Sequence, residues 1–249
     1  MTSLLGGGDP PPFLVVQPAG SSPFVFTCDH ASRRIPGRLG ALGLADEDLE
    51  RHIAWDIGIA EVARRLAERL DAFLILAGYS RLCIDANRPP GSPQSVLGSS
   101  DGTVIPGNQG LTPDDIQRRE REIFHPYHDR IALELDGRPG AVLVSLHSFT
   151  PALGGSARPW HAGVLYNRDA RLGHPLLALL RSEPGLEVGD NQPYAASDAT
   201  DYTIHAHGER RGLAHVEIEL RQDLIADETG QAIWAERLGR LLPRAVDRM

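Results

Sequence analysis

The sequence contains no lysine, so all 25 of its basic residues are arginines. Arginine grips a carboxylate through two parallel hydrogen bonds, which lysine cannot do. The two cysteines, Cys28 and Cys83, are too few for a disulfide framework, and both stand in apolar stretches. We therefore expect two buried free thiols.

Several features of other protein classes are missing from the chain. It has no run of about 18 apolar residues, so no membrane span is expected. Its first residues lack the basic segment and apolar stretch of a secretory signal, which favours a cytoplasmic protein. The net charge is −8 and the pI is about 5.7, so a basic surface for nucleic acid is not expected.

Length and composition set the expected size of the core. The chain has 249 residues and 41% hydrophobic content, which is enough for one substantial core. Residues 1–12 are rich in glycine and proline and are expected to be a poorly ordered lead-in. Residues 13–249 are expected to form a single domain.

Apolar runs and helical periodicity alternate along the chain. Buried strands are predicted at residues 24–27, 73–77, 141–146, 162–166 and 214–220, and helices at residues 45–70, 113–135, 175–182 and 227–242. Between them lie an extended segment at 80–88 and a loop at 89–112. We expect this loop to cover a substrate, and the alternative is a flexible surface insertion. Strands that alternate with helices predict an α/β fold with a mostly parallel, helix-flanked sheet.

Two histidines each follow a predicted buried strand. His30 comes after the run 24–27, and His147 after the run 141–144. Open α/β sheets place ligands and metals at the carboxyl ends of their strands, so the pair suggests a metal-dependent hydrolase. A catalytic zinc takes histidine and carboxylate ligands, and Asp56 is the candidate for the third. The alternatives are core histidines bonded to backbone and an aspartate that only complements a helix dipole.

Polar residues gather in the segment 81–88. Asn87 and Arg88 stand where the extended segment meets the long loop, and together they suit a substrate carboxylate. Arg81 is a candidate for a second carboxylate or for the oxyanion. The alternative is an ion pair between Asp85 and an arginine that holds a turn.

The run 216–221 alternates between apolar and charged residues. Glu217, Glu219 and Arg221 share one face of the predicted strand. Buried acids need a partner such as a metal, a water or an ionic substrate. Glu219 is the candidate general base, unless this is a solvated edge strand. His161 and His205 are further candidates for contacts with substrate.

These blocks, taken as an ordered set, resemble the N-formylglutamate amidohydrolase family. The matching segments are 28–32 with Ile35-Pro36, 52–58, 80–89, 145–149 and 217–224. The family looks like a relative of the zinc carboxypeptidases, which implies a three-layer α/β/α sandwich of the phosphorylase/hydrolase type. The related site order is histidine, asparagine–arginine, histidine and glutamate, here His30, Asn87-Arg88, His147 and Glu219.

The chain also departs from the carboxypeptidase pattern. Arg33 and Arg34 stand where that pattern has a glutamate shortly after the first histidine. The resemblance implies a hydrolase with one zinc per chain that cleaves an N-acyl amino acid, N-formyl-L-glutamate giving formate and glutamate. We expect a monomer or small homo-oligomer. The alternatives are a non-catalytic module that binds a carboxylated ligand, and a carboxypeptidase-like enzyme acting on another amide.

Overall fold

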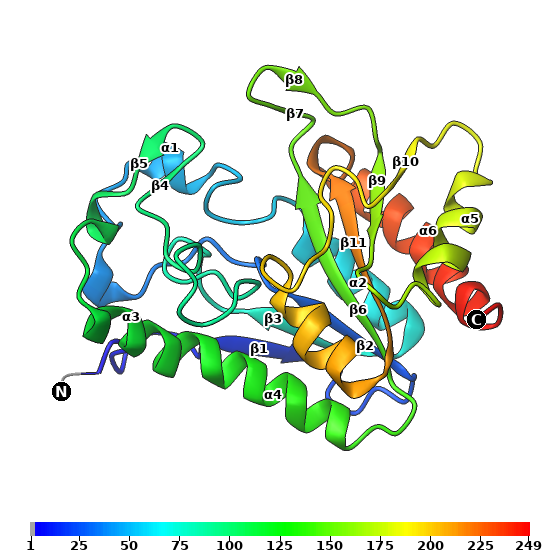
Figure 1. The fold of residues 1–249 in the computed structure, drawn as a ribbon, viewed down its shortest axis with the longest axis horizontal. Coiled ribbons are helices and arrows are strands. Elements are labelled where there is room, and N and C mark those ends of the chain that lie inside the picture. The colour runs from blue at the N-terminus through cyan, green and yellow to red at the C-terminus, as the bar shows by residue number, and fades with distance from the viewer. Residues whose placement is uncertain (1–2) are drawn as a thin grey trace.

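A seven-stranded mixed sheet lies at the centre of the computed structural model, which describes residues 3–249 (Figure 1). The strands lie in the order β1, β3, β2, β6, β11, β9, β10. Their bounds are β1 Phe13–Val16, β2 Phe24–Cys28, β3 Phe73–Ala77, β6 Val142–Phe149, β9 Ala162–Leu165, β10 Val188–Asp190 and β11 Ala214–Arg221. The neighbours β3, β2, β6 and β11 are parallel, while β1 and β9 run antiparallel to β3 and β11. The predicted mostly parallel sheet is confirmed.

Helices cover both faces of the sheet, as predicted for an α/β/α sandwich (Figure 1). Helices α2 (Ile59–Leu70), α5 (Gly173–Arg181) and α6 (Glu228–Val246) pack on one face. Helix α4 (His125–Asp136) packs on the other face through Tyr127, Ile131 and Leu135. Strands β1, β2, β3 and β6 each contribute apolar side chains to both layers, so both faces of this part of the sheet are buried.

On the face of the sheet that α4 covers, the side chains change from apolar to polar along the strands. Near its beginning β6 contributes Leu143 to the core, but Ser145 and His147 follow on the same face. In β11 the residues opposite Ser145 and His147 are Glu217 and Glu219. The alternate residues Val216, Ile218 and Leu220 lie in the core beneath α2, α5 and α6. The predicted alternation in this strand is confirmed, and it places four polar side chains at one end of the sheet.

The helix predicted at residues 45–70 is interrupted. Helix α1 (Asp46–Leu49) ends early, and α2 begins only after Gly58. Gly58 has a φ of 80°, and a Cβ there would lie 2.1 Å from the Ile225 carbonyl oxygen. Asp56 therefore lies in a connection ahead of α2, where its backbone N–H donates to the His30 carbonyl at 2.9 Å. This bond ties the acid to the first histidine.

The segment 80–88 forms consecutive turns, so the predicted extended conformation is wrong. Asp85 accepts a hydrogen bond from the Asn87 N–H at 2.9 Å. An aspartate that bonds the backbone two residues ahead favours a turn over a strand. The polar residues of this segment are brought together by these turns, since they do not share a strand face.

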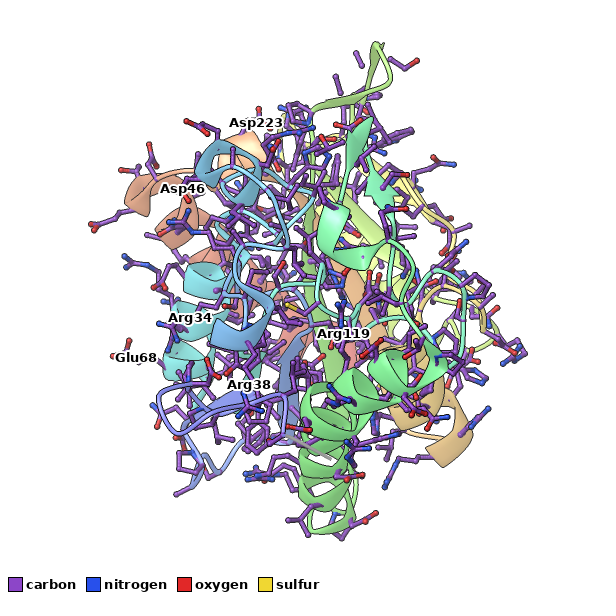
Figure 2. The ribbon with its side chains drawn as sticks, turned by 90° about the vertical axis from the view of Figure 1, so that its left-hand side faces the viewer. Arg34, Arg38, Asp46, Glu68, Arg119 and Asp223 are labelled. Carbon is purple, nitrogen blue, oxygen red and sulfur yellow. The ribbon has the colours of Figure 1, made fainter. Side chains whose placement is uncertain are left out.

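One buried arginine ties the segment 80–88 to the region that follows it. Arg119 ends helix α3 (Pro113–Arg119) and donates to the Cys83 carbonyl at 2.8 Å and to Asn108 Oδ1 at 2.7 Å (Figure 2). Strands β4 (Ser99–Ser100) and β5 (Thr103–Val104) form a small hairpin in the predicted loop. Its Gly98-Ser-Ser-Asp-Gly102 run has the Gly-x-Ser-x-Gly pattern, but a hairpin is not the strand-to-helix turn that exposes a catalytic serine.

The predicted lead-in at residues 1–12 is packed from residue 3 onward, and its first two residues lie outside the described part. Leu4 is buried, and Glu122 accepts hydrogen bonds from the backbone of Leu4 and Leu5. Glu122 lies in a π-helical turn between α3 and α4, so the lead-in is held against this helical layer. That residues 13–249 form one domain stays a prediction.

Two expectations from composition can be compared with the structure. Cys28 and Cys83 are buried and free, as predicted. Among the helices of residues 3–249, none has both the length and the apolar character required to cross a membrane.

Candidate metal centre and substrate pocket

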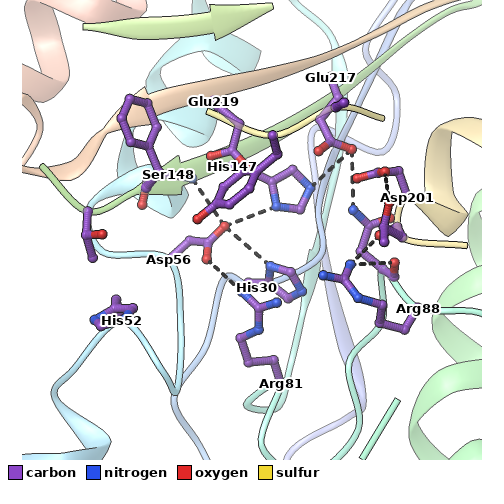
Figure 3. Close-up of a pocket in the computed structure, with 16 residues that line it drawn as sticks. His30, His52, Asp56, Arg81, Arg88, His147, Ser148, Asp201, Glu217 and Glu219 are labelled. Carbon is purple, nitrogen blue, oxygen red and sulfur yellow. Dashed lines mark hydrogen bonds and ion pairs between the residues drawn. The ribbon is translucent and has the colours of Figure 1, made fainter. Parts of the chain in front are cut away.

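Three predicted ligands converge at the carboxyl ends of β2 and β6 (Figure 3). His30 follows β2, His147 lies within β6, and Asp56 reaches them from the connection before α2. Their nearest ligand atoms all lie within 4.8 Å of one another, and all three residues are buried. We call this group the ligand cluster.

The spacing of the ligand cluster fits a tetrahedral zinc ion. Asp56 Oδ2 lies 3.4 Å from His30 Nδ1 and 3.1 Å from His147 Nδ1. Ligand atoms about 2.0–2.1 Å from a tetrahedral zinc lie about 3.3 Å from each other. Two imidazoles and one carboxylate are also the chemistry that a catalytic zinc uses, with a fourth position left for water or substrate. The residues present therefore fit the metal.

Carboxylates behind the cluster fix which nitrogen of each histidine faces inward. His30 Nε2 donates to Asp85 Oδ1 at 2.7 Å. His147 Nε2 lies 3.2 Å from Asp29 Oδ2, within reach of Ser145 as well. With a proton on each Nε2, both Nδ1 atoms offer a lone pair to the centre of the cluster. Ligating histidines in metal sites commonly have such partners.

The carboxylates around the ligand cluster shift the pKa values of its histidines, and the histidines shift that of Asp56. Burial lowers the pKa of both histidines, but the surrounding carboxylates outweigh burial and raise it, His147 most strongly. Burial opposes ionisation of Asp56, yet the two histidines hold the pKa of Asp56 well below its usual range. Asp56 is thus ionised, and the cluster attracts positive charge, whether a proton or a metal ion.

We expect Asp85→Asn to weaken zinc binding about 10- to 100-fold, because asparagine is a weaker partner for His30 Nε2 than a carboxylate. Competition with a chelator measures the affinity. Asp223→Asn makes the same chemical change in an exposed pair with Arg221 and is the control. Equal zinc affinity in the wild type and in Asp85→Asn would contradict this role of Asp85.

Two buried glutamates lie next to the ligand cluster on β11 (Figure 3). Burial raises the pKa of Glu219 to about 7. Glu219 Oε2 is buried and has no hydrogen-bond partner among the described residues. Burial and the nearby Asp201 raise the pKa of Glu217 well above its usual value. Because a buried polar atom normally has a partner, the free oxygen of Glu219 indicates a water or substrate group at this place.

The asparagine–arginine pair lies beside these glutamates. Asn87 Nδ2 donates to Glu217 Oε2 at 3.3 Å, and Asn87 Oδ1 accepts from the Thr203 N–H at 3.0 Å. One amide hydrogen of Asn87 is left for a ligand. Arg88 donates to the carbonyls of Asn87 and Thr200 through Nη1. The remaining donors of its guanidinium can face the pocket, which both residues line.

Arg81 makes the ion pair that the sequence offered as an alternative. It donates to Asp85 through Nε and Nη2, at 3.2 and 2.7 Å, and its Nη1 lies 3.6 Å from Asp56 Oδ1. Arg81 still lines the pocket with a quarter of its side chain exposed. Arg81 therefore lies between the ligand cluster and the solvent-exposed end of the pocket.

Most of these groups line one pocket of about 310 Å³, which we call the inner pocket. Its walls include the ligand cluster, Glu217, Glu219, Arg81, Asn87 and Arg88, which come from β6, β11 and three connections. The volume is within the range of small-molecule sites. Most of the predicted site is thus assembled in one place.

Three predicted substrate contacts are not brought to the inner pocket. Arg221 ends β11 and pairs with Asp223, because the strand carries it past the pocket. His161 Nδ1 accepts from the Glu187 backbone N–H at 2.9 Å, which ties β9 to β10 at the far edge. His205 contacts Glu209 and Arg168 in a surface ion cluster. These histidines have local structural partners, as lone histidines usually do.

Sequence reasoning missed several residues that surround the site. Asp29 and Ser145 were absent from the candidates, although Asp29 immediately precedes His30 and Ser145 lies two residues before His147. Tyr194 and Asp201 reach the pocket from the stretch after β10. That stretch has no strand or helix periodicity, so only the folded chain shows where it lies.

The comparisons with known proteins agree with this geometry. The family model described as "FGase: N-formylglutamate amidohydrolase" matches residues 22–226. The gene product Atu2144 from Agrobacterium tumefaciens is 36% identical, covers 98% of both chains and superposes with a TM-score of 0.93. No curated protein matches the sequence.

More distant solved structures share the fold. N-formylglutamate amidohydrolase from Ralstonia eutropha JMP134 is 21% identical, covers 95% of this chain and 98% of its own, and has a TM-score of 0.70. The tripeptide-bound cell shape determinant Csd4 from Helicobacter pylori is 8% identical over 95% of this chain and 55% of its own, with a TM-score of 0.50. The family model covers most of the chain, so this protein belongs to the N-formylglutamate amidohydrolase family.

Proposed function

We propose that this protein is a zinc-dependent amidohydrolase that cleaves an N-acyl amino acid, with N-formyl-L-glutamate as the substrate that the family suggests. The observation that carries the proposal is the free carboxylate oxygen of Glu219 beside the ligand cluster. Family membership also favours a hydrolase over a module that only binds carboxylates.

His30, His147 and Asp56 would hold the metal. Zinc bound there would lower the pKa of a water molecule and polarise the amide carbonyl. Glu219 accepts the proton of the attacking water and later donates it to the leaving nitrogen. Water and N-formyl-L-glutamate thereby become formate and glutamate, with no other reactant consumed.

The arginines of the pocket supply the positive charge that the substrate needs. Arg88 and Asn87 bind one carboxylate of the amino acid, because a guanidinium and an amide can both donate to its oxygens. Arg81 is the second cation of the inner pocket, and it lies where it can bind the side-chain carboxylate or the developing oxyanion. Binding at two points aligns the amide with Glu219.

The proposal is tested by incubating the zinc-loaded protein with N-formyl-L-glutamate and following formate and glutamate release. We expect equal amounts of both products, and no release after zinc is removed by a chelator and the chelator is dialysed away. Re-addition of zinc restores the rate. Failure of the zinc-loaded protein to hydrolyse N-formyl-L-glutamate or any other N-acyl amino acid would overturn the proposed function.

Activity is expected to fall as the pH drops below about 7. Glu219 must be ionised to accept a proton, and burial raises its pKa to about 7. A bound cation favours the ionised form, so the midpoint of the acid limb lies at or below this value. A profile of kcat/KM from pH 4 to 8 measures it, with about a tenfold fall per pH unit below the midpoint for a single proton. A flat profile would contradict the role of Glu219.

A further inference from the structure

A second cavity of about 370 Å³ adjoins the inner pocket. His52, Arg81 and Tyr194 line both spaces, so these three residues mark the boundary where the two meet. We call the second cavity the outer lobe. It is as large as the inner pocket, and the proposed chemistry does not use it.

The outer lobe lies between two hairpins. Leu97, Ser100 and Asp101 belong to the β4–β5 hairpin and the chain before it. Leu153 and Gly154 belong to the hairpin of β7 (Ala152–Leu153) and β8 (Ser156–Ala157). Figure 1 shows the two hairpins apart from each other, with β4 and β5 at the upper left and β7 and β8 at the top.

Large apolar side chains remain exposed around this lobe. Leu97 is 37% exposed, Leu153 is 40% exposed and Tyr194 is 42% exposed. They come from three segments that are far apart in the sequence. Ile53 and Leu82 lie beneath them and complete the apolar wall. Exposed apolar side chains that gather around one cavity mark a place where an apolar group binds.

The charged groups of the outer lobe are already paired. Arg81 binds Asp85 at 2.7 Å. Asp101 pairs with Arg51 at 3.2 Å and lies 3.5 Å from His52 Nε2. The acids of the lobe thus have arginine partners, so an apolar chain that binds there leaves no carboxylate unpaired.

The outer lobe meets the inner pocket on the side of the ligand cluster that faces away from Arg88. Figure 3 shows Arg88 on one side and His52 on the other, with His30, His147 and Asp56 between them. A substrate carboxylate on Arg88 places the amide at the cluster. The acyl group then extends toward His52 and into the outer lobe.

We propose that the outer lobe binds an apolar acyl chain, so that the preferred substrates are N-acyl amino acids with an acyl group of several carbons. This inference rests on the proposed amidohydrolase function and on the carboxylate being held by Arg88 and Asn87. It assigns the selectivity for the acyl group to Leu97, Leu153 and Tyr194.

A series of substrates tests the inference. The zinc-loaded protein is given L-glutamate carrying N-formyl, N-acetyl, N-butanoyl or N-hexanoyl groups. We expect kcat/KM to rise with chain length, by up to about fourfold per buried methylene. N-formyl-L-glutamate as the best substrate of the series would overturn the inference and leave the proposed function intact.

Leu97→Trp should fill the outer lobe. We expect it to reduce kcat/KM for N-hexanoyl-L-glutamate at least about tenfold, while the value for the formyl substrate stays within about twofold. Leu153→Asp, on the facing hairpin, should give the same selective loss by placing a charge in the lobe. Leu133→Trp, on the exposed side of α4, is the matched control and should change neither value. Equal losses for both substrates in the two lobe variants would overturn the inference.

Binding separates this inference from the proposed function. Calorimetry with zinc-loaded Glu219→Gln protein compares the binding of N-hexanoyl- and N-formyl-L-glutamate while turnover is strongly reduced. We expect the hexanoyl compound to bind at least about tenfold more tightly. This result supports the acyl site even where no substrate is hydrolysed, and equal or weaker binding of the hexanoyl compound overturns it.

Discussion

Glu219→Gln is expected to lower kcat by about 10²- to 10⁴-fold while the protein keeps its zinc, which is the range for loss of a general base. Glutamine has nearly the shape of glutamate but cannot accept the proton of a water molecule. Glu219 lies next to the ligand cluster on β11 and directly opposite His147 in the sheet register. Steady-state kinetics and elemental analysis of the same sample give both quantities.

Glu217→Gln is the informative comparison, since Glu217 lies two residues earlier on the same face of β11. Burial and Asp201 raise the pKa of Glu217 well above its usual value, which favours the neutral carboxyl, and glutamine can keep the contact with Asn87. We therefore expect a much smaller loss than for Glu219→Gln. Equal losses would show that Glu219 has no special role.

His147→Asn is expected to abolish both stoichiometric zinc binding and turnover. The variant keeps the bulk of the side chain but removes one of the three ligand atoms, and asparagine is a poor zinc ligand. Circular dichroism checks that the sheet is intact. His174→Asn, in an exposed histidine bonded to Tyr166, is the control and should keep full zinc content. Normal activity of His147→Asn after chelation would contradict the proposed metal chemistry.

The two histidines could be predicted from sequence because each follows an apolar run in a parallel sheet. The register between β6 and β11 then brings His147 next to Glu219. The strict alternation of the run 214–220 made it recognisable as a strand, but its place beside β6 and the register of the pair are seen only in the folded chain. The three layers agree with the sandwich that the family resemblance implied.

Other features depend on tertiary packing that a local pattern cannot show. The interruption ahead of α2 results from Gly58, which the Ile225 carbonyl approaches too closely for any side chain. Asp56 reaches the histidines because of this interruption, and its backbone bond to His30 fixes the approach. The periodicity of residues 45–70 is continuous enough to predict one helix, so it gives no sign of the break.

Partners outside the inner pocket also explain why some predicted substrate contacts do not line it. Arg221 lies on the same face of β11 as Glu217 and Glu219. It is the last residue of the strand, where Asp223 is close enough to pair with it. His161 and His205 were chosen for their chemistry alone, and the structure gives each a neighbour outside the pocket. Asp85 makes the expected ion pair and also accepts a hydrogen bond from His30 Nε2, because the turns of 80–88 bring its carboxylate next to this histidine.

The central claim is that His30, Asp56 and His147 hold one catalytic zinc. The most direct measurement is zinc K-edge X-ray absorption combined with elemental analysis of the purified wild-type protein. The account predicts about one zinc per chain, with two nitrogen ligands and oxygen ligands at about 2.0–2.2 Å. Absence of bound metal after dialysis against zinc, or a bound zinc whose nitrogen ligands persist in His147→Asn, would contradict it.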